Sequence, residues 1–194
     1  GIIMNVLKML KTPVILLVGV LTICVVSLSY AKELPKQLGQ KDSQSALAFS
    51  VDELRHVIGE WSVVTKFLSP KGDIAQEVDG TYQFHWVVED RVVSGRSDIP
   101  SLGQSSAILF YINEEAQSIA MSAVGKDGKL WIMTGKLGEN SRETDYFSPV
   151  PNVEQKLRFT RFNVKADSFE SKMEYTLDKG KTWTQGNHQL FTRK

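Results

Sequence analysis

The sequence predicts an all-β protein, an antiparallel up-and-down β-barrel of about 8–10 strands preceded by one short N-terminal helix. Two observations favour this fold. From Trp61 onward, apolar and polar residues alternate with a period of two, and β-branched and aromatic residues dominate. Turn-forming groups such as Lys126-Asp127-Gly128 recur through the same region. A meander of this length hides its edges best by closing on itself, whereas a flat sandwich, the alternative, usually needs longer crossover loops.

The first 31 residues have the pattern of a secretory signal peptide. Lys8 and Lys11 supply positive charge, residues 13–28 are almost entirely apolar, and Ser29-Tyr30-Ala31 places small residues where a signal peptidase cleaves. The apolar run of about 16 residues is shorter than the roughly 20 that a membrane-spanning helix needs, so a cleaved signal is favoured over a permanent anchor. We expect a secreted or periplasmic protein that begins near Lys32 and has no stable membrane insertion.

Composition excludes several classes of partner and of stabilising bond. The single cysteine, Cys24, lies within the predicted signal, so the mature chain forms no disulfide. Bulky Ile23 stands before it, where a lipoprotein signal has a small residue, which disfavours lipidation. Removing residues 1–31 leaves 23 minus 2, that is 21, basic residues against 22 acidic ones. Bulk charge therefore gives no attraction to nucleic acid.

The mature chain divides into a tether and one domain. Residues 32–48 are polar, rich in Gln, Lys and Ser, and without apolar period, so we predict a disordered tether. Residues 49–194 form the expected barrel domain, long enough to bury a sizeable core.

A helix of about two turns is predicted at the start of this domain. Ser50 suits the N-cap, and Glu53, three positions on, completes a capping box. Leu54 and Val57 begin an apolar stripe at helical spacing, and Gly59 suits the residue of positive φ that ends such a helix.

Strands fill the rest of the domain, separated by short turns. We expect about ten antiparallel strands, over 61–68, 74–88 with a break near Gly80, 91–97, 105–112, 117–124, 129–135, 142–147, 156–164, 168–177 and 182–193.

Gly59-Glu60-Trp61, together with Arg193 in the last strand, resembles the Gly-x-Trp and late Arg of the lipocalin and wider calycin barrels. The resemblance implies that the indole plugs one end of the barrel while the guanidinium stacks on it and bonds nearby carbonyls. Residues 84–91 and 167–183 look like segments of a bacterial lipocalin-like, calycin-type family of uncharacterised function. The similarity covers roughly residues 50–193 and implies a barrel with a possible cavity, without supplying an activity.

Aromatic and methionine side chains in the predicted strands are typical of cavities that take apolar ligands. The alternative is that they fill the interior. Arg158 and Arg161 lie on opposite faces of one strand, so one of them points inward, where it needs an acid or a ligand carboxylate. The residues that we predict to line a ligand site are Tyr82, Phe84, Trp86, Met121, Trp131, Met133, Arg158 and His188.

The segment from Thr176 to Trp183 resembles the Asp-box of sialidase propellers. In those enzymes the pattern repeats once per blade, whereas it occurs once here in a chain too short for a propeller. We therefore predict a structural hairpin turn, in which Asp178 bonds turn amides and Trp183 packs beneath.

No metal or cofactor is expected. His56, His85 and His188 are far apart and never stand at metal-ligand spacing. Nitrobindins, haem-binding barrels of similar type, use a histidine late in the chain, as His188 is. The glycine-rich run that follows their first tryptophan is replaced here by residues 62–66, which disfavours haem.

These patterns predict an exported, non-catalytic β-barrel, monomeric or weakly dimeric, that binds a small apolar or amphipathic molecule. The sequence holds no Gly-x-Ser-x-Gly elbow, and acids such as Glu89 and Asp90 fall in predicted turns, where carboxylates are normally solvated. Two alternatives stay open, a barrel enzyme acting on a small hydrophobic molecule and a ligand-free envelope scaffold.

Overall fold

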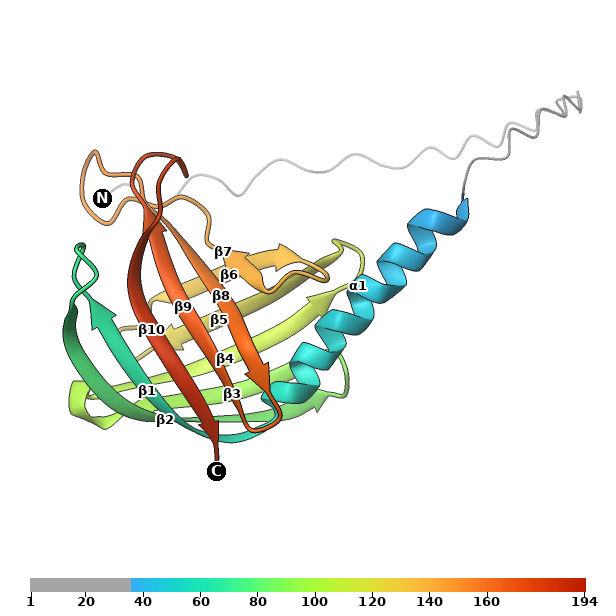
Figure 1. The fold of residues 1–194 in the computed structure, drawn as a ribbon, viewed down its shortest axis with the longest axis horizontal. Helices are drawn as coiled ribbons and strands as arrows, with labels where there is room; N and C mark the ends of the chain where they lie inside the picture. The colour runs from blue at the N-terminus through green and yellow to red at the C-terminus, as the bar shows by residue number, and fades with distance from the viewer. Residues whose placement is uncertain (1–35) are drawn as a thin grey trace, which may run out of the picture. The chain divides into compact units, whose positions relative to one another are not determined.

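The computed structural model describes residues 36–194, and within this range ten strands form one closed barrel preceded by the helix α1 (Figure 1). A short 3-10 turn, η1 (Pro100–Leu102), connects β3 to β4. The elements are α1 (Lys36–Val57), β1 (Gly59–Leu68), β2 (Ile74–Val88), β3 (Val92–Ile99), β4 (Gln104–Asn113), β5 (Ser118–Gly125), β6 (Leu130–Lys136), β7 (Ser141–Glu143), β8 (Lys156–Lys165), β9 (Ser168–Thr176) and β10 (Thr184–Arg193).

Each strand pairs antiparallel with its neighbours along the chain, and β1 also pairs with β10, which closes the ring. In that last ladder Trp61 lies opposite Arg193. The ring has no edge strand, and its thinnest link is β7, which pairs with β6 only at Thr134↔Glu143 and with β8 at three positions. The predicted up-and-down barrel with one preceding helix is therefore confirmed.

Strand positions follow the prediction closely, with two differences. The predicted break near Gly80 is wrong, because β2 runs continuously from Ile74 to Val88. A Cβ at Gly80 would lie 2.8 Å from the carbonyl oxygen of Asp98, so the glycine serves close packing of two strands rather than a turn. The seventh strand is also shorter than the predicted 142–147, because after Glu143 the pairing with β8 becomes irregular and Phe147 makes only an isolated bridge to Gln155.

The helix differs more. α1 has 22 residues, so the predicted two-turn helix is too short, and the prediction of a disordered tether over 32–48 is wrong from Lys36 onward. Lys, Gln, Leu and Ala have favourable helix propensities, and Ala46 and Leu47 pack against the buried core. Ser50 lies inside the helix rather than at its N-cap, and its Oγ accepts a 3.0 Å hydrogen bond from the amide of Gly138.

The core gathers where α1 meets the barrel (Figure 1). The helix contributes Val51, Leu54 and Val57, all buried. The strands contribute a second set of buried apolar side chains to the same cluster: Trp61, Val63, Val93, Phe110, Ile112, Ile119, Phe169 and Phe191. The C-terminal half of α1 therefore stabilises one end of the barrel.

Trp61 occupies the centre of this closed end. The indole is fully buried, and its Nε1 donates a 2.8 Å hydrogen bond to the carbonyl of Val57. Arg193 places its guanidinium 4.2 Å from the centre of the ring and donates to the carbonyls of Ile58 and His56 at 2.7 and 2.9 Å. These are the kinds of contact that the calycin resemblance implied.

The predicted signal peptide, residues 1–31, and residues 32–35 of the predicted tether lie outside the described residues. No helix in the described part of the chain is both long enough and apolar enough to span a membrane.

Candidate functional site

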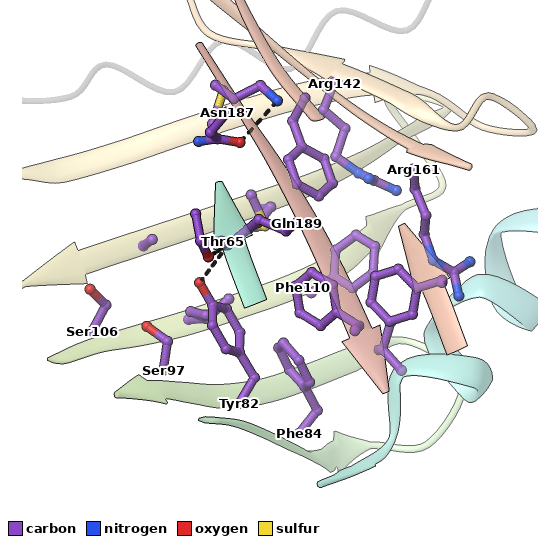
Figure 2. A pocket seen from close by; sticks show the side chains of 18 of the residues that line it. Thr65, Tyr82, Phe84, Ser97, Ser106, Phe110, Arg142, Arg161, Asn187 and Gln189 are labelled. Carbon is purple, nitrogen blue, oxygen red and sulfur yellow. Dashed lines mark hydrogen bonds between the residues drawn. The ribbon is translucent and has the colours of Figure 1, made fainter. Parts of the chain in front are cut away.

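Side chains that point inward from the strands enclose a cavity of about 280 Å³ (Figure 2). Most of its lining is aromatic or aliphatic, because alternate residues of each strand face the interior. The rings that line it include those of Tyr82, Phe84, Phe110, Phe159, Phe169 and Phe191.

The cavity has two chemically different ends. Ser97 and Ser106, near the end of β3 and the start of β4, lie at one end. Arg142 and Arg161 lie toward the opposite end, and Arg161 is close to α1 (Figure 2). An apolar section of aromatic rings separates hydroxyl groups from guanidinium groups.

Between these two ends, uncharged side chains of the cavity wall form a hydrogen-bond network. Gln189 donates from Nε2 to Thr65 Oγ1 at 3.0 Å and to the Tyr82 hydroxyl at 3.3 Å (Figure 2). Its Oε1 accepts from Ser171 Oγ at 3.1 Å. Burial raises the pKa of the Tyr82 phenol, so Tyr82 is a neutral, polar group in the lining.

The charged end contains a buried ion pair between Glu53 of α1 and Arg142 of β7. The two side chains are 3% and 1% exposed. The Arg142 guanidinium also lies 4.5 Å from the centre of the Phe110 ring. A buried pair of this kind is sustained only if further contacts satisfy its remaining polar atoms.

A second buried cation stands beside the pair. Arg161 of β8 hydrogen-bonds from Nη2 to His56 Nδ1, and its guanidinium lies 4.5 Å from the Phe169 ring. His56 Nε2 lies 2.6 Å from the carbonyl oxygen of Lys165, so Nε2 carries the proton and Nδ1 is the acceptor. This tautomer is neutral, and burial lowers the pKa of His56 below its ordinary value. Burial also lowers the pKa of Arg161 to about 10, which leaves it protonated at neutral pH.

Some polar atoms at this end have no protein partner. Among the described residues, the buried side-chain atoms without a hydrogen bond are Glu53 Oε2, Arg142 Nε and Arg161 Nε. All belong to side chains that line the cavity. Buried donors without partners are costly, which marks this end as the place where a ligand could supply hydrogen bonds.

The cavity brings together part of the predicted ligand set. Tyr82, Phe84 and Met121 line it. Trp86 instead packs against the apolar core cluster, and Met133 is buried without lining the cavity. The alternation in these strands was a sound guide to the inward face, but it does not say which inward side chains border a space.

Arg158 and His188 lie on the outer face of the barrel, contrary to the prediction. Arg158 pairs with Glu174 at 3.1 Å and lies 4.0 Å from the Trp183 ring. His188 lies 2.6 Å from Glu170. The register of β8 turns Arg161 inward. In β10 the alternate residues Asn187, Gln189 and Phe191 line the cavity, so His188 between them turns outward.

Trp131 lies in a separate groove, with Gly103, Lys126 and other loop residues. Its ring is 4.1 Å from Lys129 Nζ and stands edge-on to Phe147 at 5.2 Å. The groove shares Ser106 and Ala123 with the main cavity. Trp131 is therefore near the hydroxyl end of the barrel rather than within the cavity.

Sequence reasoning missed the charged residues that matter most here. Glu53 was assigned to a capping box, and Arg142 carried no signal, because a three-residue strand has no pattern of its own. Arg161 was recognised only as one of two candidates for an inward arginine. The signal that could have found it is parity, since it lies two residues from Phe159 on the same face.

The hairpin at Asp178 has the expected kind of turn. Asp178 Oδ1 accepts from the Thr182 amide at 2.9 Å, and Oδ2 accepts from the Thr182 hydroxyl at 2.7 Å. These hydrogen bonds lower the pKa of Asp178 to about 2. Trp183 is covered by Arg158 on the outer surface.

Within residues 36–194, the structure holds no group of three or more His, Cys, Asp or Glu side chains placed to bind a metal.

No protein-family model and no curated protein matches this chain. Solved structures of similar trace include Rv2717c from M. tuberculosis, with 10% identity, a TM-score of 0.49, and coverage of 75% of this chain and 97% of that one. The phycobiliprotein lyase CPES from Guillardia theta has 11% identity, a TM-score of 0.40, and coverage of 78% and 97%. EF1p2_mFAP2b bound to DFHBI has 12% identity, a TM-score of 0.37, and coverage of 75% and 98%. Likenesses this distant carry no argument about function, so the proposals below rest on the chain's own residues.

Proposed function

We propose that this protein is a lipocalin-like, calycin-type carrier that binds one small amphipathic molecule inside its barrel. The observation that carries the proposal is the apolar cavity of about 280 Å³ with buried charged side chains at one end. Ligand sites are mostly apolar with a few placed polar groups, and range over roughly 300–1,000 Å³, so this cavity suits a small ligand. The stacking of Arg193 on Trp61 supports the calycin-type kinship.

The polar groups of the cavity support a carrier rather than an enzyme. A general acid or base needs a proton or lone pair free to reach a substrate. Both ring nitrogens of His56 are hydrogen-bonded, so this ring has neither a proton nor a lone pair free for a substrate. These contacts favour binding without chemistry. The hollow interior in turn favours a carrier over a ligand-free scaffold.

The test is a titration with the neutral fluorescent probe N-phenyl-1-naphthylamine. We expect the native protein to bind about one probe per chain, with quenching of tryptophan fluorescence as the cavity fills. Ala123→Trp places an indole into the cavity that Ala123 lines, and should weaken probe binding at least tenfold.

Ala107→Trp is the matched control, because Ala107 is exposed on the outer face of the adjacent strand β4. It should leave probe binding unchanged, with thermal melts reporting whether both variants fold. Equal loss in both variants would place the probe on the surface. A native protein that takes up no probe, fatty acid or haem at micromolar concentration would favour the scaffold alternative.

We also propose export, on the charged, apolar and small residues of positions 1–31. Intact-mass analysis of protein isolated from its host should give an N-terminus at Lys32. A retained N-terminal segment would instead indicate an anchor. Sedimentation should show a monomer or a weak homodimer.

A further inference from the structure

We propose that the ligand carries a single negative charge, a carboxylate, which binds to Arg161 and Arg142 at the α1 end of the cavity. This inference rests on the proposed carrier function and names the chemistry of its ligand. It follows from the charge balance of the lining, from unused hydrogen-bond donors, and from the apolar section beside them.

The charge balance of the cavity is positive. Among the described residues that line it, the charged ones are Arg142, Arg161 and Glu53. His56, beside them, is neutral because its Nε2 proton is directed at the Lys165 carbonyl. One positive charge is therefore left without a counterion in a site shielded from water. A buried charge is costly unless it is paired, and a monoanion supplies the missing partner.

Unused donors are available in the same place. Arg142 Nε and Arg161 Nε are buried and have no hydrogen-bond acceptor, and both residues are more than nine-tenths buried. Guanidinium groups bind carboxylates through two parallel hydrogen bonds, which are stronger than bonds between neutral groups. A carboxylate offers two oxygen atoms, so it can satisfy donors from both arginines.

Glu53 limits the charge of the head group. Its Oε2 also lies buried at this end without a donor. A second negative charge on the ligand would be repelled by this carboxylate in a medium of low dielectric constant. The site therefore favours a monoanion over a phosphate monoester, which carries nearly two charges at neutral pH.

The remainder of the cavity fits an apolar tail. Phe84, Phe110, Met121 and Phe159 line the same space as the arginines, and Ser97 and Ser106 lie at its other end (Figure 2). A ligand that buries its carboxylate beside α1 would direct its tail along these rings. The volume of about 280 Å³ suits a short or medium chain.

Isothermal titration of the purified protein with four ligands of equal chain length tests the head group. The ligands are decanoate, decanol, decyl phosphate and decyltrimethylammonium. We expect decanoate to bind at least tenfold more tightly than decanol or decyl phosphate, and the cation to bind most weakly. If decanol binds as tightly as decanoate, or decyl phosphate binds more tightly, the carboxylate inference is wrong while the carrier function stands. If none of the ligands and no neutral probe binds, the carrier function itself fails.

The variant Arg161→Gln tests whether Arg161 binds the carboxylate head group. It should reduce decanoate affinity at least tenfold and leave decanol affinity within twofold, whereas Arg161→Lys, which keeps the charge, should retain more of the decanoate affinity. Arg158→Gln is the matched control, because Arg158 lies on the same strand and faces outward to Glu174. An equal effect of Arg158→Gln and Arg161→Gln on decanoate would overturn the assignment. Should Arg161→Gln fail to fold, Arg161→Lys, which loses the two parallel donors of the guanidinium, should still bind decanoate more weakly than Arg158→Lys does, and equal affinities of these two variants would overturn the assignment.

Discussion

Trp61 links the helix, the first strand and the last strand through one side chain. Its ring is fully buried, contacts Phe169 and Phe191 edge-on, and is covered by Arg193. The indole nitrogen also satisfies the carbonyl of Val57 near the helix end. A large cavity would remain if the ring were removed.

We therefore expect Trp61→Ala to reduce the free energy of unfolding by about 3–5 kcal/mol, measured by urea denaturation. Arg193→Ala should cost less, because Arg193 is only partly buried whereas Trp61 is fully buried. Equal and negligible effects of both substitutions would contradict this account of the closed end.

The buried ion pair leads to a second prediction. Glu53→Leu alone leaves Arg142 charged and unpaired in the core, and should cost about 3–5 kcal/mol of unfolding free energy. The double variant with Arg142→Leu should be more stable than Glu53→Leu alone, because no lone charge stays buried. Urea melts of the two single variants and the double variant measure the coupling. A double variant that loses the sum of both single losses would contradict the pairing.

The lowered pKa of His56 predicts that stability depends on pH. Burial holds its pKa in the folded protein below the unfolded value of about 6.5, so below that pH the unfolded chain binds a proton more readily. Arg161 and Arg193 oppose the protonated form as well, while Glu53 and the Lys165 carbonyl favour it. Above pH 6.5 this group has no effect, and stability should fall as pH drops from about 6.5 toward the folded pKa.

Urea melts between pH 5 and 8 measure this effect. His56→Gln should flatten the slope below pH 6.5, because glutamine does not titrate. The same substitution at exposed His85 is the control and should leave the slope unchanged. A slope that is unaffected by His56→Gln would assign the acid sensitivity to other groups.

At the scale of elements, α1 is the part that sequence patterns described least well. Polar residues before Ser50 gave no apolar period, and the helix there is held by a few contacts, those of Ala46 and Leu47 with the core. Gly138, at positive φ, would place a Cβ 3.0 Å from Ala46, so a loop of the barrel approaches the helix closely. Tertiary contacts of this kind have no local signature, which is why the helix start could not be predicted.

Truncation tests this part of α1. A chain that begins at Phe49 should lose about 1–2 kcal/mol of unfolding free energy relative to one that begins at Asp42, because Ala46 and Leu47 no longer cover the core. Thermal and urea melts of both chains make the comparison. If the two chains are equally stable, residues 42–48 are a dispensable tether.

The long strands were predictable because each of them carries its own sequence pattern. Alternation along β2 and the turn residues at either end define both its limits and its inward face, which holds Tyr82 and Phe84. The short strand β7 has no such pattern, and its one inward side chain, Arg142, was missed. Cavity-lining residues could be predicted in strands where apolar and polar residues alternate over a long stretch, and they were missed in a strand as short as β7.

At the scale of the whole molecule, the site is a property of barrel closure. Glu53, Arg142 and Arg161 are far apart in the sequence and meet only when α1, β7 and β8 are assembled around one interior. Sequence patterns can assign each residue to the inner or outer face of its strand. The charge balance of the interior also depends on which inward-facing side chains line the same cavity. That balance, and with it the ligand chemistry, became visible only in the assembled structure.

The ladder between β1 and β10 also constrains how the molecule is made. Trp61 finds its partner Arg193 only when β10 is available, so the sheet stays open until that strand has been made. Contacts between such distant residues slow folding, and an open sheet exposes two unpaired edges in the meantime. Aggregation during synthesis should therefore depend on how long the earlier strands wait for β10, more than on the stability of the finished barrel.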